Sequence, residues 1–326
     1  MRVRSASCIG ILALFLGISL AGCAGLADTA SLRSTPNGLS PIEAEPRLSV
    51  VTTRKPIDDA AAEPWFGSER GSQMSVAQVR LASPAQAGRF SLAAVGLVDW
   101  RISRVEIVPN LVLGDGDVLL YIHGFNQSFE TATLDAARLA DGLRFSGETV
   151  LFSWPSRNKL FDYIADRESA TWSRDALETT LDSLVARPGP GRVNIVAHSM
   201  GAMLAIEGLR QAYAKHGERL LDRIGAIILA APDLDIDVFS ASIARMRPLA
   251  ARITVITSND DRALAVVTSL SGGARVGRAQ KAKLQAYGLK VIDTSGAGWG
   301  IINHDLFLSD SAVQKVIARA IASGRS

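Results

Sequence analysis

The stretch Arg192–Gly201, which reads RVNIVAHSMG, is the most informative part of the sequence about the fold. An apolar run rich in β-branched residues ends at Ala197, and Ser199 follows inside the tight turn A-H-S-M-G. The residues that come next, AMLAIEGLRQAYAKHG, favour a helix. A serine at such a strand-to-helix corner projects its hydroxyl above the sheet edge, where it can attack a carbonyl carbon. We therefore expect Ser199 to be a nucleophile. The alternative is a buried strand that merely ends in a serine, because Ala197 stands where the usual signature has Gly.

Buried strands and helices alternate on both sides of this stretch. From Asp117 onward, apolar runs occur at DVLLYIHG, TVLFSWP, VNIVAHS, IGAIILAAP, RITVITS and LKVIDTS. Helices are expected at Ser128–Phe145, Leu160–Ala186, Ala202–His216 and Val238–Met246, and from Asn303 to the C-terminus. This alternation is typical of an α/β fold, a mostly parallel sheet with helices on both faces. Ligands bind at the carboxyl ends of such strands, which is where Ser199 is expected.

The residues before Asp117 follow a different pattern. From Arg47 to Pro109, the short runs RLSVVTTR, SVAQVRLA and WRISRVEIVP alternate apolar and polar residues. They predict antiparallel strands with one solvated face at the N-terminal edge of the sheet.

The first residues, MRVRSASCIGILALFLGISLAGC, have a basic start and an apolar stretch too short to span a bilayer. They end on Leu20-Ala21-Gly22-Cys23, which resembles a bacterial lipoprotein box. We predict a signal peptide at 1–22, lipid such as palmitate on Cys23, a flexible tether at 23–46 and one domain at 47–326. An ordinary signal peptide is the alternative. The resemblance implies a lipid anchor in the bacterial envelope, at the periplasmic face of the outer membrane because Ala24 offers no acidic retention cue.

Charge and cysteine content exclude several classes of protein. The net charge is +3, and loss of residues 1–22 removes two arginines and no acid, which leaves about +1. A net charge this close to neutral does not indicate the excess of basic residues that is typical of nucleic-acid-binding proteins. The only cysteine besides Cys23 is Cys8, inside the predicted leader, so the mature domain would hold no disulfide. No motif calls for a metal or a cofactor.

A serine nucleophile needs a base, and the chain has four histidines. His198 is adjacent to Ser199 and leaves the backbone in another direction. His216 precedes Gly217 at an expected helix end. His123 follows the first parallel strand, upstream of the serine. His304 follows the last strand, so the order serine, acid, histidine used by α/β-hydrolases favours it as the base. The alternative for His304 is a cap on the final helix.

Two strand ends supply carboxylates for the acid that orients this base. SNDDRAL contains Asp260 and Asp261, and APDLDID contains Asp233, Asp235 and Asp237. The acid most often follows the strand before the histidine's strand, which favours the first run. Within that run we choose Asp261, with Asp260 as the close alternative. One of these two is also expected to cap a helix. The second run lacks the Gly and Glu of a calcium loop, and Asp233 or Asp235 is expected to cap the helix that follows it.

Acyl transfer also needs donors for a developing oxyanion. One is expected to be the N–H of Met200, and the other the N–H of Phe125 in the loop HGFNQSFE, where Gly124 allows a close turn. Asn126 can contact substrate or bond to its own loop backbone.

Several motifs together resemble one family. YIHGFNQSFE, LFSWPS, NIVAHSMG, APDLDIDVF and TSNDDRAL, with SVVTTRKP and WFGSERG upstream, closely resemble bacterial α/β-hydrolases of unknown function. The resemblance runs from Arg47 to the C-terminus and implies the α/β-hydrolase fold and an esterase-like or lipase-like enzyme. It also implies Ser199 as nucleophile, Asp261 as acid because the acid precedes R/K-A-L, and His304 as base, although Asn303 stands where the family has Gly.

The function predicted from these residues is hydrolysis of a small-molecule or lipid ester through an acyl-serine intermediate. Two other functions remain open. One is a lipid-anchored binding or scaffold protein that keeps the fold without the chemistry. The other is an acyltransferase that uses the same residues with an acceptor other than water.

Overall fold

The computed structural model describes residues 46–58, 63–82, 100–159, 162–258, 274–279, 281–295 and 306–324. These residues belong to one compact unit. The predicted signal peptide at 1–22 and the tether at 23–46, apart from Pro46, lie outside the described residues, so their boundaries stay predictions.

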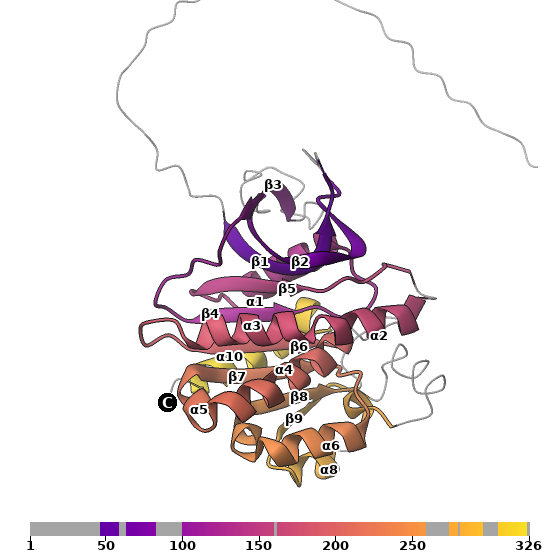
Figure 1. The fold of residues 1–326 in the computed structure, drawn as a ribbon. Helices are drawn as coiled ribbons and strands as arrows, with labels where there is room; N and C mark the ends of the chain where they lie inside the picture. Colours follow the sequence, from indigo (N-terminus) through magenta and orange to yellow (C-terminus); the bar gives the residue numbers. More distant parts are fainter. Residues whose placement is uncertain are drawn as a thin grey trace, which may run out of the picture. The chain divides into compact units, whose positions relative to one another are not determined.

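The described residues form one sheet of nine strands in the order β3-β2-β1-β5-β4-β6-β7-β8-β9 (Figure 1). The strands are β1 (Arg47–Pro56), β2 (Phe66–Ala82), β3 (Arg101–Val108), β4 (Val118–Ile122), β5 (Glu148–Ser153), β6 (Val193–His198), β7 (Ile224–Ala230), β8 (Ile253–Thr257) and β9 (Lys290–Asp293). β1 and β2 pair antiparallel, as do β2 and β3, whereas every pair from β1–β5 to β8–β9 is parallel. The predicted fold class, a mostly parallel sheet with antiparallel strands at its N-terminal edge, is confirmed.

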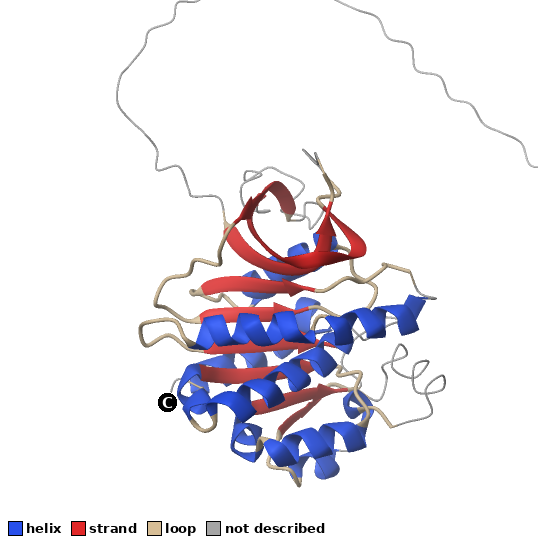
Figure 2. Ribbon diagram, in the orientation of Figure 1, coloured by secondary structure: helices blue, strands red, loops and turns tan. Residues whose placement is uncertain are grey.

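Helices cover both faces of the sheet (Figure 2). The helices are α1 (Phe129–Gly142), α2 (Tyr163–Trp172), α3 (Arg174–Val185), α4 (Met200–His216), α5 (Arg219–Arg223), α6 (Ile236–Arg245), α8 (Lys281–Gln285), α9 (Leu306–Ser309) and α10 (Ser311–Ser323), with short 3-10 helices η4 (Arg247–Arg252) and η5 (Val276–Arg278). One buried cluster joins the sheet to α3, α4 and α6, and a second joins it to α1, α9 and α10. None of the helices in the described ranges is long and apolar enough to cross a bilayer.

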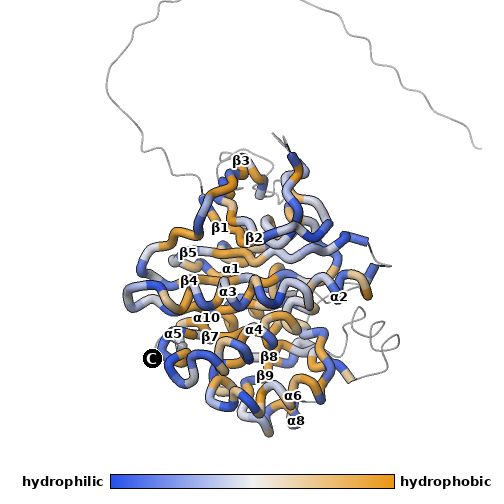
Figure 3. The backbone as a smooth tube through the Cα atoms, in the orientation of Figure 1, coloured by the Kyte–Doolittle hydropathy of each residue, from blue (hydrophilic) through white to orange (hydrophobic). Residues whose placement is uncertain are grey.

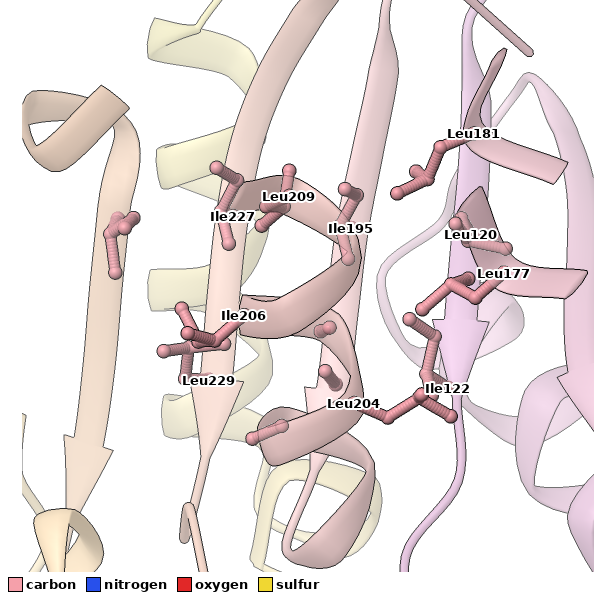
Figure 4. Close-up of a cluster of buried hydrophobic side chains, with 14 of the residues drawn as sticks. Leu120, Ile122, Leu177, Leu181, Ile195, Leu204, Ile206, Leu209, Ile227 and Leu229 are labelled. Carbon is pink, nitrogen blue, oxygen red and sulfur yellow. The ribbon is translucent and has the colours of Figure 1, made fainter. Parts of the chain in front are cut away.

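The central strands are buried on both faces, which explains their near-continuous apolar sequence. Every residue of β4, β6 and β7 is buried, and these strands are apolar along most of their length (Figure 3). Successive side chains alternate between the two clusters, so Leu120 faces α3 and α4 while Leu119 and Tyr121 face α1. Figure 4 shows the first cluster, in which Leu120, Ile122, Ile195, Ile227 and Leu229 of the strands meet Leu177 and Leu181 of α3 and Leu204, Ile206 and Leu209 of α4.

The structure differs from the sequence-based expectations at three places. β1 is buried along most of its length instead of having one solvated face, because it lies third from the edge and pairs with β5. The helix expected at Leu160–Ala186 is divided at Ser173, whose hydroxyl bonds back to the Ser169 carbonyl and thereby bends the chain. The final helix is divided at Asp310, which caps α10 through its side chain.

Candidate active site

Ser199 lies at the corner where β6 ends and α4 begins. Its φ of 51° and ψ of −120° are unfavourable for a residue with a Cβ and cost about 1–3 kcal/mol. Neighbouring backbone holds this conformation: the Ser199 N–H donates to the Ala230 carbonyl at 2.9 Å, and the Ser199 carbonyl accepts from the Asp233 N–H at 3.1 Å. The Ser199 side chain makes no hydrogen bond to another described residue. The strained backbone at this corner therefore lowers the stability of the fold and leaves the Ser199 hydroxyl without a hydrogen bond to the described residues. This is the geometry of a nucleophile elbow.

Two glycines allow the β4 loop to pack against this corner. A Cβ on Gly201 would lie 2.2 Å from the His123 carbonyl oxygen, and a Cβ on Gly124 would lie 3.0 Å from the Ser199 Cβ. Ala197 stands in register between Ile122 of β4 and Leu229 of β7. Its methyl group fits this interior position of the sheet, so an alanine is accommodated where the usual signature has glycine.

The loop after β4 brings Phe125 and Asn126 to the same edge of the sheet. Among the described residues, neither the Phe125 N–H nor the Met200 N–H donates a hydrogen bond to backbone. The Met200 N–H belongs to the first turn of α4, where helix geometry leaves donors without an intrahelical acceptor. Asn126 has a φ of 61°, a conformation that asparagine tolerates better than most residues. The backbone conformation at 126 therefore favours an asparagine, and both roles expected for its side chain stay predictions.

His123 is fully buried beneath that loop and stacks on the Trp154 indole with ring centroids 4.8 Å apart. Its Nδ1 lies 2.8 Å from the Gly124 carbonyl oxygen, and its Nε2 accepts from the Trp154 N–H at 3.1 Å. Only the Nδ1–H tautomer makes both bonds. Burial lowers the pKa of His123 to about 3, with the Arg54 cation as the next cause, so the ring is neutral at neutral pH. His123 thus braces the loop.

The other two described histidines also lie away from the Ser199 hydroxyl. His198 points to the opposite face of the sheet, where its ring lies 4.8 Å from that of Phe307. His216 ends α4, and its Nε2 lies 2.7 Å from an Asp182 oxygen of α3. Among the described histidines, none is therefore a candidate for the base.

The remaining predicted site residues lie outside the described residues. The chain is described up to Ser258, directly after β8, and again from Leu306 at the start of α9. Asp260 and Asp261 follow the first of these points, and His304 precedes the second. Cys23 lies before the described part of the chain. The acid, the base and the lipidated cysteine therefore stay predictions.

Asp233, in the loop after β7, contacts two polar residues that sequence reasoning missed, Tyr163 of α2 and Arg275. Asp233 is buried and accepts a hydrogen bond from the Tyr163 hydroxyl at 2.6 Å, and the Arg275 Nε lies 3.4 Å from its other oxygen. The Tyr163 ring also packs edge-on against Phe125. Burial, followed by the charge of Asp233, raises the pKa of Tyr163 to about 12. Of the two aspartates expected to cap the next helix, Asp235 does so.

Tyr163 and Arg275 gave no sequence signal because their contacts with Asp233 join segments far apart in the chain. The described side chains include no group of three or more His, Cys, Asp or Glu that could hold a metal ion.

A family model described as alpha/beta hydrolase of unknown function (DUF900) matches residues 109–320. The chain belongs to this family. Over 131 residues it is also 26% identical to an uncharacterised protein of Nostoc sp., an alignment that spans 32% of this chain and 32% of that protein. The aligned part is therefore about a third of the relative's length.

Two solved esterase structures align with the chain at low similarity. A Pyrobaculum calidifontis esterase aligns with a TM-score of 0.40 and 13% identity over 86% of each chain. Est1E from Butyrivibrio proteoclasticus aligns with a TM-score of 0.38 and 12% identity over 76% of this chain and 96% of its own.

Proposed function

We propose that this α/β-hydrolase is a serine hydrolase that cleaves an acyl ester through an acyl-serine intermediate. Ser199 is the nucleophile, His304 the base and Asp261 the acid, with Asp260 as its alternative. The N–H groups of Phe125 and Met200 receive the oxyanion. The observation that carries the proposal is the positive φ of Ser199 at a strand-to-helix corner.

In the acylation step, the Ser199 Oγ attacks the ester carbonyl carbon while His304 takes the hydroxyl proton. The carbon–oxygen bond to the alcohol breaks, and the proton passes from His304 to the leaving oxygen. In the second step, His304 takes a proton from water, and the resulting hydroxide attacks the acyl carbon. The Ser199 oxygen leaves and recovers a proton, which releases the carboxylic acid.

The positions of the described residues allow this assignment. Phe307 comes three residues after His304, and its ring lies 4.8 Å from that of His198, the neighbour of the nucleophile. Asp261 comes three residues after Ser258, which follows β8 at the same edge of the sheet.

Turnover of short acyl esters of p-nitrophenol tests the proposal. Ser199→Ala removes the attacking oxygen and leaves the backbone of the corner in place. Ester hydrolysis should therefore fall to the uncatalysed rate in buffer, while the thermal unfolding temperature is little changed. Hydrolysis retained by the folded variant would remove Ser199 from the mechanism.

We further propose that lipid on Cys23 holds the enzyme at the bacterial envelope, at the periplasmic face of the outer membrane, where it meets small-molecule or lipid esters. This proposal rests on the lipoprotein box alone. Cys23→Ala should abolish palmitate incorporation and release the protein from the membrane fraction. Membrane association that persists without labelling would point to another anchor.

A further inference from the structure

Arg54 comes from β1, outside the 109–320 range that the family model matches, yet it is buried inside the hydrolase domain at 1% exposure. β1 runs parallel to β5, with Thr52 opposite Ser153. Arg54 is two residues further along β1, so it lies at the carboxyl edge of the sheet, where Ser199 also lies. Arg54 of the motif SVVTTRKP, which the proposed function does not use, thus places a positive charge next to the candidate site.

The guanidinium of Arg54 is held by oxygens from three segments. Its donors reach the Ser153 hydroxyl at 2.9 Å, the Ser156 carbonyl at 3.1 Å, the Gly67 carbonyl at 3.4 Å and the Gln127 carbonyl at 2.8 Å. Gln127 belongs to the loop that carries Phe125. Arg54 therefore joins the N-terminal strands to the candidate oxyanion loop.

Gln127 is fixed at both of its backbone groups. Its carbonyl accepts from Arg54, and its N–H donates to the Ser156 hydroxyl at 3.2 Å. The Ser156 hydroxyl in turn donates to the buried carboxylate of Asp166 in α2. Because a peptide plane is rigid, holding both groups fixes the course of the chain immediately after Phe125 and Asn126.

A second connection runs through His123. One guanidinium nitrogen of Arg54 lies 3.5 Å from the His123 Nε2, and the His123 Nδ1–H donates to the Gly124 carbonyl. The C=O and N–H of a trans peptide point in opposite directions, so a Gly124 carbonyl held toward His123 turns the Phe125 N–H away from it. The positive charge of Arg54 thus lies behind a line of aligned dipoles that ends at the Phe125 N–H, and such a line strengthens its last donor.

The charge of Arg54 is not neutralised by a direct ion pair. Among the described residues, no carboxylate lies within 4.0 Å of its guanidinium nitrogens. Burial lowers the pKa of Arg54 to about 10, which leaves the group charged at neutral pH, and the charges of Glu130 and Asp166 act in the opposite direction. A buried cation without a direct partner is costly, and its field extends into the surrounding loop.

We propose that Arg54 is a positioning residue for the oxyanion site: it holds the 123–127 loop against Ser199 and directs its positive charge through His123 toward the Phe125 N–H. This inference rests on the proposed serine hydrolase and adds to it that β1 supplies a residue that positions the oxyanion loop. Arg54 acts through the loop and does not touch the substrate.

The test compares Arg54→Lys with Arg70→Met. Arg70 is exposed and lies opposite Arg54 on β2, so it serves as a matched control. Lysine keeps the charge but cannot bond Ser153, Ser156 and Gln127 together, so the loop should loosen while the core stays filled. For Arg54→Lys, the kcat on a short acyl ester should fall by about 100-fold with KM within threefold, since a lost oxyanion donor acts on the transition state. The control should keep the kcat of the wild type.

Rates are taken per folded molecule, with thermal unfolding measured for each variant. If Arg54→Lys does not fold, Ser156→Ala decides, because it removes the acceptor of the Gln127 N–H with a minimal change of volume; its kcat should fall at least about tenfold with KM unchanged. A kcat within threefold of the wild type in the deciding variant overturns the inference, as does a loss confined to KM. Ser199→Ala separates the two proposals: activity retained there refutes the proposed function, whereas activity lost there but kept in the deciding variant refutes only the role of Arg54.

Discussion

The buried histidine beneath the oxyanion loop makes acid stability a direct test of the structure. His123 is fully buried and lies close to the Arg54 cation. Burial, followed by that charge, lowers its pKa from 6.5 to about 3, while its hydrogen bonds to Gly124 and Trp154 act in the opposite direction. In an unfolded chain the same ring has its ordinary pKa. We therefore predict that replacing His123 by asparagine, which cannot take up a proton, changes how stability depends on pH.

The sign follows from proton binding. Between pH 6.5 and about 3, the unfolded chain carries a proton on His123 that the folded protein does not, so unfolding takes up a proton. The free energy of unfolding therefore falls as the pH falls through this window, and the contribution is complete above pH 6.5. One pKa unit corresponds to about 1.4 kcal/mol, so a change from pH 7 to pH 5 should cost the folded state about 2 kcal/mol through this residue.

Urea unfolding of the wild type and His123→Asn at pH 7 and pH 5 measures this difference. Asparagine can still donate to the Gly124 carbonyl, which favours a folded variant. Other titratable groups, among them Asp166, whose pKa burial raises, are present in both proteins and cancel in the comparison. The wild type should lose about 2 kcal/mol more than the variant. Equal losses in the two proteins would show that His123 is not buried in its neutral form, and the reasoning about the loop would fail with it.

Three further predictions concern the site and the helix after β7. Gly124→Ala places a Cβ 2.8 Å from the His198 Nδ1, next to the nucleophile, so kcat should fall by about 10- to 100-fold. In the control Gly116→Ala the new Cβ meets nothing within 4 Å, so full activity should be kept. Equal activities of the two variants would contradict the close packing at Gly124. Asp235→Ala removes the N-cap of α6 and should cost about 1 kcal/mol in urea unfolding with little effect on kcat, and unchanged stability would argue against the cap. Asp261→Asn should reduce ester hydrolysis far more than Asp260→Asn, and the reverse ranking would exchange their roles.

The parts of the fold with local signals could be predicted from the sequence. The strand-to-helix corner at Ser199 and the parallel strands follow from apolar runs that alternate with helical stretches. The role of β1 could not be predicted, because SVVTTRKP alternates like an edge strand and nothing in it indicates pairing with β5.

The polar contacts between segments far apart in the chain could not be predicted from the sequence either. Arg54 bonds to carbonyl groups, which every residue carries, and the Tyr163–Asp233 bond joins residues seventy positions apart. Neither contact leaves a pattern of residue types. The candidate nucleophile was therefore accessible to sequence reasoning, whereas the network that braces its surroundings required the structure.

The central claim is that Ser199 is an activated nucleophile, and covalent labelling tests it most directly. The full chain is treated with a fluorophosphonate, and the site of modification is mapped by peptide mass spectrometry. We expect one adduct per molecule, located on Ser199 and absent after Ser199→Ala or prior unfolding. A folded protein that remains unlabelled, or an adduct on another residue, would contradict it.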